Sequence, residues 1–142
     1  ATPNIAELAR AVADAGADGL SLVNTLRGLA LDPKTHRPRL VLGPGGASGP
    51  PLRPIALACV HACAEAVELP IVGIGGVTSG RDVLDFVAVG ASAVALGTVL
   101  FADPFAPARI RGELEREARS HGNASAAEIG RDVPGSTFAS RA

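Results

Sequence analysis

Apolar segments with helical spacing alternate along the chain with short, continuous apolar runs. The first kind predicts helices packed on a core, and the second predicts buried strands. Strands that alternate with helices are typical of a parallel sheet wrapped by helices, so we expect an α/β fold. The predicted elements are a helix from about 3 to 16, strand 19–24, a helix that follows Pro54, strand 71–74, helix 79–90, strand 93–96 and a last helix that opens at 103–104.

Several helices carry recognisable start signals. Thr2 is the expected N-cap of the first helix, with Pro3 at its first position. Ser79, followed three residues later by Asp82, forms an Asp variant of the capping box. Asp103 is expected to cap the last helix.

Two stretches lack this periodicity. Residues 25–49 gather Gly, Pro and charge, which predicts a long ordered loop of the kind that often carries function. Beyond Gly122 the residues become small and polar. We therefore expect one domain over 1–122 and a flexible polar tail over 123–142.

The segment 16–22 is echoed by 90–96, and the two lie two strand–helix units apart. Such reuse is expected of a (β/α)8 barrel, which needs eight strands. Three complete strands would leave two open edges and an uncovered face. We therefore expect the chain to need a missing N-terminal half, another copy of itself or a partner, and the absence of an initiating Met fits a fragment.

Charge and composition exclude several classes of function. The net charge is −1 without a cluster of Lys and Arg, which argues against nucleic-acid binding. No apolar run approaches the roughly 18 residues that span a bilayer, and no export signal is visible, so we expect a cytoplasmic protein. Trp and Tyr are absent, so a ligand would be held by backbone groups and small polar side chains.

No residue has the surroundings of a catalytic base. Cys59 and Cys63 are expected to be small buried side chains on one helical face, without further ligands for a metal. His36, His61 and His121 have no evident Asp or Ser partner. We expect no catalytic residue in this chain.

Glycines mark two neighbouring strand ends. Gly75 and Gly76 follow strand 71–74, and Gly97 with Thr98 follows strand 93–96. Glycines there let backbone N–H groups approach an anion, and the following helix could add the positive end of its dipole. Barrels commonly bind phosphate after their last two strands, although glycines can also serve only to make tight turns.

A third strand end carries Asn24 and Thr25. An Asn amide both donates and accepts hydrogen bonds, which suits a planar ligand with carbonyl and N–H edges. The alternative is an ordinary strand-end cap. The segment 45–50 is a weaker candidate, because glycine-rich turns are common.

Together these blocks resemble the C-terminal half of dihydroorotate dehydrogenases, most closely the NAD-linked class, over about residues 1–122. The blocks that carry the resemblance are 24–28, 45–50, 54–57, 73–77 and 97–98. The resemblance implies the C-terminal half of a (β/α)8 TIM barrel with FMN at its mouth.

The resemblance also implies roles for individual residues. Its FMN phosphate would lie against Gly75, Gly76, Gly97 and Thr98, while Val23 and Gly49 would contact the cofactor elsewhere. Asn24 and Thr25 would hydrogen-bond the pyrimidine ring of dihydroorotate or orotate. The family oxidises dihydroorotate in pyrimidine (UMP) biosynthesis by removing a proton and a hydride, and a partner subunit with an iron–sulfur cluster and FAD passes electrons to NAD.

The base cysteine, a flavin-contacting lysine and further substrate asparagines belong to that family's N-terminal half. We therefore expect the isolated chain to bind phosphate poorly and to catalyse nothing. Two alternatives stay open: a barrel similar to that of dihydropyrimidine dehydrogenases, and a non-catalytic half-barrel that self-associates and binds flavin or phosphate.

Overall fold

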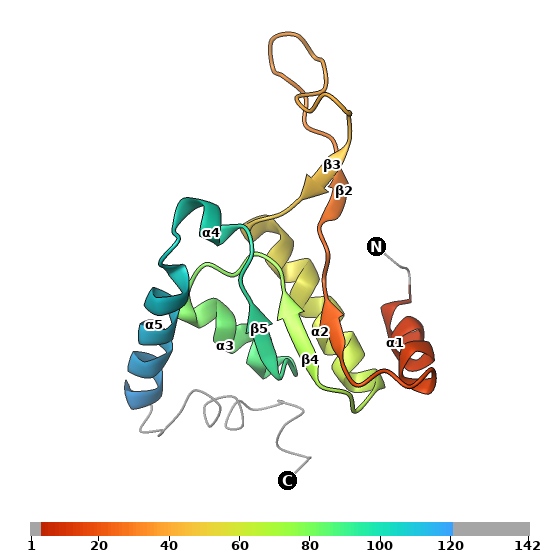
Figure 1. Cartoon of the computed structure of the whole chain (residues 1–142), viewed down its shortest axis with the longest axis vertical. Helices are drawn as coiled ribbons and strands as arrows, with labels where there is room; N and C mark the ends of the chain where they lie inside the picture. The colour runs from red at the N-terminus through yellow and green to blue at the C-terminus, as the bar shows by residue number, and fades with distance from the viewer. Residues whose placement is uncertain (1–3, 121–142) are drawn as a thin grey trace.

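The computed structural model describes residues 4–120, and within them a three-stranded parallel sheet forms the centre of the fold (Figure 1). The strand order is β1–β4–β5, with Leu20 opposite Ile71 and Val72 opposite Ala93. The α/β prediction is confirmed. The sheet strands are β1 (Leu20–Leu22), β4 (Ile71–Ile74) and β5 (Ala93–Ala95), and the longer helices are α1 (Ile5–Asp14), α2 (Arg53–Ala66), α3 (Gly80–Ala88) and α5 (Ala106–Ser120).

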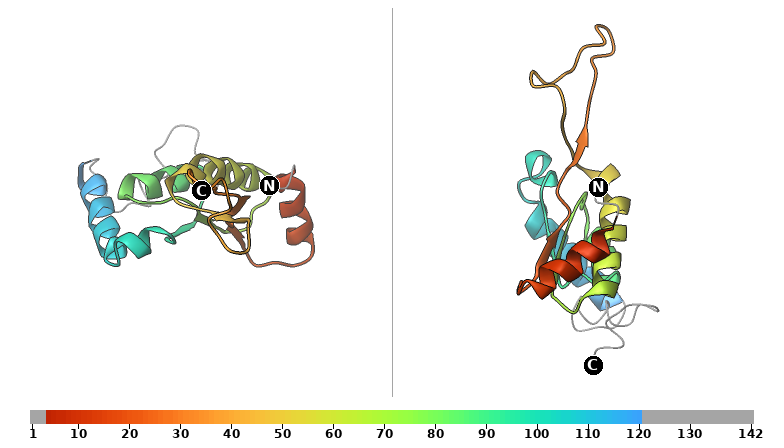
Figure 2. Two further views of the ribbon diagram at one scale, coloured as in Figure 1. Left: turned by 90° about the horizontal axis from the view of Figure 1, so that it is seen from above. Right: turned by 90° about the vertical axis from the view of Figure 1, so that its right-hand side faces the viewer.

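Helices α2 and α3 cover one face of the sheet, with α1 packed beside α2 and α5 beside α3 (Figure 2). Alternate strand residues supply the apolar contacts of this face, as period-two strands require. Ile71, Val60 and Phe86 are almost completely buried there. Gly73 leaves room for the Phe86 ring, because a Cβ on Gly73 would lie 2.5 Å from Phe86 Cδ1.

The opposite face of the sheet is open within residues 4–120. Val72 and Ile74 point to this face and are only half-buried, while Ile71 and Gly73 on the helix face are buried. The outer edges of β1 and β5 pair with no described strand. A sheet with helices on one face and an open inner face is the arrangement of a barrel segment, whose inner face is filled by the remaining strands.

The structure corrects several predicted boundaries. Asn4, not Thr2, caps α1, with its Oδ1 atom accepting from Glu7 N at 3.2 Å. Helix α5 begins at Ala106, later than expected, and Asp103 Oδ1 accepts from Phe105 N at 3.0 Å just before it.

Other predictions of helix structure are confirmed. Ser79 and Asp82 form the predicted capping box of α3. On α5, Ile110 and Ala118 are buried. On α2, Cys63 is buried as expected, whereas Cys59, also expected to be buried, is only half-buried.

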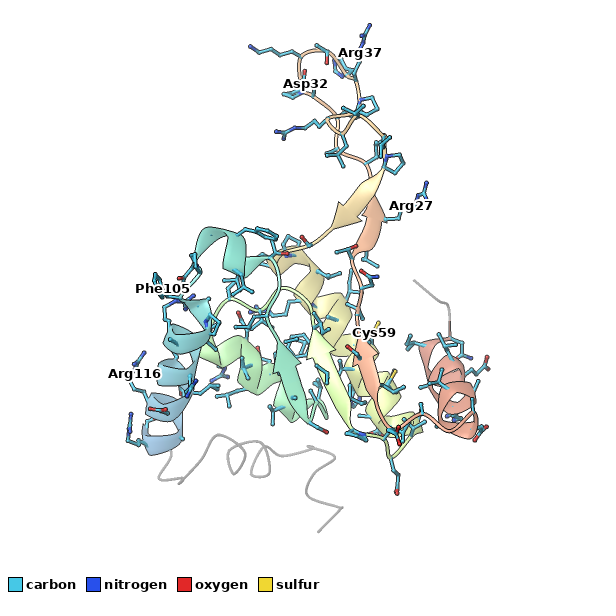
Figure 3. The ribbon with its side chains drawn as sticks, in the orientation of Figure 1. Arg27, Asp32, Arg37, Cys59, Phe105 and Arg116 are labelled. Atoms are coloured by element: carbon cyan, nitrogen blue, oxygen red, sulfur yellow. The ribbon has the colours of Figure 1, made fainter. Side chains whose placement is uncertain are left out.

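The segment 25–49, which we expected to be a long ordered loop, contains an antiparallel hairpin that protrudes from the sheet (Figure 1). Its strands are β2 (Leu26–Gly28) and β3 (Gly45–Ala47). This hairpin, called the arm below, carries Arg27, Asp32 and Arg37 away from the helices (Figure 3). Glycines make up much of this hairpin and have low strand propensity, which explains why the pattern did not reveal it.

Two short elements were also missed: the 3-10 helix η1 (Pro50–Leu52) and helix α4 (Val99–Ala102). No helix among residues 4–120 is long and apolar enough to cross a membrane. The predicted tail, 123–142, lies outside the described residues, so the domain division stays a prediction.

Candidate functional site

A cavity of about 570 Å³ opens where the three parallel strands end. All eight residues that the sequence pointed to as binding residues line it. Nine further residues complete the wall. The predicted residues are Val23, Asn24, Thr25, Gly49, Gly75, Gly76, Gly97 and Thr98, and the others are Ser21, Ser48, Pro50, Leu52, Ile74, Val77, Thr78, Val99 and Ala102.

Strand direction brings these residues together. The carboxyl ends of parallel strands share one rim, so the segments after β1, β4 and β5 meet there. Val23 N donates to Ile74 O at 2.9 Å and keeps the end of β1 alongside β4. The return from the hairpin supplies the fourth part of the wall, where Leu52 N donates to Gly49 O at 2.9 Å and closes the turn of η1.

Two adjacent glycines shape the turn after β4. Gly75 has a φ of +145° and Gly76 a φ of +70°, conformations that favour glycine. A Cβ on Gly75 would lie 2.6 Å from Ala56 Cβ, and one on Gly76 would lie 2.6 Å from Gly49 O. Glycine is therefore needed here for close contact as well as for backbone conformation.

Helix α3 does not offer its N-terminus to a ligand, contrary to our expectation from the dipole. Asp82 Oδ2 accepts from Thr78 N at 2.8 Å and from Ser79 N at 3.1 Å. Glu113 Oε2 accepts from Gly80 N at 2.6 Å. Two carboxylates therefore already occupy the N–H groups of residues 78–80 at the start of this helix, so an anion in the cavity would meet the glycine turn instead.

Within residues 4–120, the N–H groups of Gly76, Gly97 and Thr98 donate no hydrogen bond to the protein. They belong to two neighbouring strand ends that line the same cavity. A Cβ on Gly97 would meet nothing within 4 Å, so this segment leaves open space in front of its backbone. Such unpaired donors in a concave wall suit an anionic group.

Asn24 and Thr25 form a local pair at the base of the arm. Asn24 Oδ1 accepts from Thr25 N at 2.7 Å, which is the strand-end capping that we considered as the alternative role. The Asn24 amide nitrogen donates to no residue of 4–120. The cap therefore fixes the side chain and leaves one side of the amide for a ligand.

Sequence reasoning missed the hydroxyl groups of the wall. Ser21 lies two residues before Val23 on β1, so period-two alternation could have placed it on the same face. Thr78 directly follows the glycine block. No Asp, Glu, Lys, Arg, His or Cys lines the described part of the cavity.

The perturbed titratable groups lie outside this cavity. Burial raises the pKa of the Cys63 thiol, whose Sγ lies 4.0 Å from Ile5 O between α1 and α2. Backbone and side-chain hydrogen bonds from Thr35 lower the pKa of Asp32 on the arm. Both cysteines lie on α2, where Cys63 is part of the apolar core and Cys59 packs against it (Figure 3). Among residues 4–120, no three His, Cys, Asp or Glu side chains are placed to hold a metal ion.

The sequence matches proteins of known family. A profile of the family described as dihydroorotate dehydrogenase matches residues 2–117. The catalytic subunit of dihydroorotate dehydrogenase B (NAD(+)) from Citrifermentans bemidjiense is 49% identical over 123 residues, which cover 84% of this chain and 40% of that protein. A putative dihydroorotate dehydrogenase A (fumarate) from Solibacter usitatus is 46% identical over 131 residues, covering 90% and 43%. The chain thus spans about two fifths of these relatives.

Solved structures share the fold. A crystal structure of the dihydroorotate dehydrogenase of Eimeria tenella in complex with ferulenol superposes with a TM-score of 0.74 at 24% identity, covering 97% of this chain and 35% of that one. The ligand-free enzyme from the same organism gives the same TM-score at 23% identity. The predicted partial (β/α)8 barrel is confirmed, and by its sequence the chain belongs to the dihydroorotate dehydrogenase family.

Proposed function

We propose that this chain supplies the flavin-phosphate site and part of the substrate site of a dihydroorotate dehydrogenase, which oxidises dihydroorotate to orotate with FMN. One observation carries the proposal: the eight residues that the family resemblance assigns to cofactor and substrate line a single cavity at the strand ends. The 49% sequence identity to a NAD(+)-type catalytic subunit supports it.

The donor set of the cavity fits the phosphate of FMN. The N–H groups of Gly76, Gly97 and Thr98 are unpaired within residues 4–120, and no carboxylate lines the wall to repel an anion. Gly75 contributes by letting the turn pack closely on Ala56. Backbone donors in a preformed turn would bind phosphate without losing side-chain freedom. Val23 and Gly49 would border the flavin beside this turn.

Asn24 and Thr25 would orient the pyrimidine ring. Asn24 keeps its amide group rigid through the bond to Thr25 N and could donate its N–H to a ring carbonyl. A side chain fixed before binding places the substrate carbons with less loss of entropy. Bound FMN would supply the hydride acceptor of the reaction. The base that removes the proton would be a cysteine of the N-terminal half.

We also propose the protein partners of this chain in the complete enzyme. The open sheet face would be filled by the N-terminal half of the barrel, and the complete enzyme would form a homo-oligomer. Relatives named as NAD(+)-type catalytic subunits favour an iron–sulfur and FAD subunit as electron carrier. The relative named as a fumarate enzyme shows why the acceptor needs direct measurement. A cytoplasmic location stays a prediction.

An anaerobic titration of the complete enzyme, with its N-terminal half, tests this function. Dihydroorotate should bleach the flavin absorbance, and dihydrouracil should do so far more slowly. In Asn24→Ala, loss of a substrate hydrogen bond should lower kcat/KM by roughly 10- to 100-fold while FMN stays bound. Arg27→Ala, outside the cavity wall, is the control and should behave as wild type.

The competing functions give different outcomes in this titration. Faster bleaching by dihydrouracil would favour a dihydropyrimidine dehydrogenase. No bleaching by either substrate, with flavin still bound, would favour a non-catalytic flavin module. Either result would overturn the proposed activity.

A further inference from the structure

Two walls of the cavity are joined directly behind the glycine turn. One wall belongs to the segment 49–53, which leads from the hairpin into α2 and lines the cavity through residues 49, 50 and 52. The other belongs to the segment 75–79, which lines it through residues 75–78. They touch at Gly76, where a Cβ would lie 2.6 Å from Gly49 O and 3.0 Å from Arg53 N. The distance between the walls is therefore set by backbone contact.

The buried carboxylate of Asp82 connects the same two walls. Its Oδ2 atom holds Thr78 through both N and Oγ1 at 2.8 Å, and its Oδ1 atom forms an ion pair with Arg53 Nη1. The Asp82 side chain is 5% exposed and that of Arg53 is 35% exposed. One carboxylate thus fixes the end of the glycine turn with one oxygen and the start of α2 with the other.

The role of Arg53 in this arrangement differs from that of a phosphate ligand. Arg53 does not line the cavity, and its guanidinium is engaged by Asp82. Loss of the cation would leave a buried carboxylate without its partner, which is energetically costly. We therefore expect the ion pair to remain formed. An ion pair of this kind restrains both segments at once.

We propose that Arg53 is a positioning residue for the flavin phosphate, which acts through Asp82 to hold the 75–79 turn against the 49–53 segment. This inference rests on the proposed function, since it requires the phosphate to bind at the glycine turn. The pair does not touch the ligand. It fixes the turn that carries the Gly76 N–H group, which would.

The test compares FMN with riboflavin, which lacks the phosphate, in the complete enzyme stripped of flavin. Quenching of flavin fluorescence gives both dissociation constants. Arg53→Gln should weaken FMN binding about tenfold or more, while riboflavin binding should change less than about twofold. Arg53→Lys keeps the cation and should recover part of the FMN affinity.

Arg81→Gln is a matched control. Arg81 pairs with Asp85 on the same helix at 3.7 Å, but its side chain is 72% exposed, so removal of this pair should change neither constant. In the double variant Arg53→Gln with Asp82→Asn, the dissociation constant for FMN should rise by less than the product of the two single fold-changes, because both substitutions break the same ion pair.

Flavin binding distinguishes the role of Arg53 from the existence of the phosphate site. Equal weakening of FMN and riboflavin in Arg53→Gln, or unchanged FMN affinity, would overturn the positioning role while leaving the phosphate site intact. A wild-type enzyme that binds riboflavin as tightly as FMN would overturn the phosphate site, and the positioning role with it.

Discussion

Single glycines determine how closely the walls of the cavity approach each other. Gly76 combines a φ of +70° with contact to Gly49 O, whereas Gly97 faces open space. Both were predicted as binding residues from their place after a strand, but the sequence gives no sign of what lies opposite each one. Their different surroundings depend on contacts between segments far apart in the chain.

This difference predicts opposite tolerance to a methyl group. Gly76→Ala should lower the free energy of unfolding of the complete enzyme by about 2–4 kcal/mol, because backbone strain and overpacking act together. Gly97→Ala keeps its N–H and meets no neighbour within 4 Å, so it should change stability by less than about 1 kcal/mol. Chemical denaturation of both variants measures this, and equal losses would contradict the assignment of the contact at Gly76.

At the scale of elements, α3 is held between α2 and α5 by charged groups at its N-terminus. Arg53 reaches it from α2, and Arg109 on α5 donates to Thr78 O at 3.2 Å and to Glu113 Oε1 at 2.8 Å. The sequence predicted the capping box of α3, because its residues are local. It could not predict the bonds from α2 and α5, because these join residues about 30 apart.

The Glu113 bond predicts a dependence of stability on pH. The N–H of Gly80 first, and the Arg109 guanidinium second, lower the pKa of Glu113 below its ordinary value of 4.5. A lowered pKa in the folded state means that the stabilisation is complete above that value and is lost as the pH falls through the folded pKa.

Glu113→Gln should therefore cost about 1 kcal/mol at pH 7, since the side chain is a quarter exposed, and should lose less stability than wild type on acidification. Denaturant midpoints at pH 7 and below pH 4 measure both effects. Glu115→Gln is the control, because its carboxylate lies 3.9 Å from Arg119 in an exposed pair and should cost almost nothing at pH 7. An equal loss of stability in both variants would contradict the stabilising role of the Glu113 hydrogen bonds.

Helix α5 also contains a glycine in its interior. A Cβ on Gly112 would come no closer than 3.5 Å to any neighbour, which is ordinary contact. Gly112→Ala should therefore stabilise the enzyme by about 0.5–1 kcal/mol through the helix propensity of Ala. A thermal unfolding curve measures the shift, and a lower midpoint would show that the helix surface is covered by another part of the protein.

At the scale of the whole molecule, the sheet has one face covered by helices and one face open within residues 4–120. The alternation of helices and strands predicted the parallel sheet, and the resemblance predicted the partial barrel. The hairpin was missed because its pairing relies on glycine backbones, such as Gly46 packed against Thr25, which carry no strand-like pattern. The spacing of apolar residues predicts elements that pack through their side chains. It does not predict elements whose contacts are made by glycine backbones.

The open face predicts the behaviour of the chain when it is expressed alone. Exposed strand edges and half-buried Val72 and Ile74 should make it prone to association, and the incomplete cavity should leave it colourless. Co-expression with the N-terminal half should give a yellow, flavin-bound protein. A yellow oligomer of the chain alone, measured by its visible spectrum and solution mass, would contradict the need for that half.

We expect the flavin phosphate to bind at the turns after β4 and β5. A crystal structure of the complete enzyme with FMN and orotate tests it most directly. We predict phosphate oxygens about 2.7–3.2 Å from the backbone nitrogens of Gly76 and of Gly97 or Thr98, with the orotate ring against Asn24. A phosphate bound elsewhere, with these N–H groups facing only solvent, would contradict the claim.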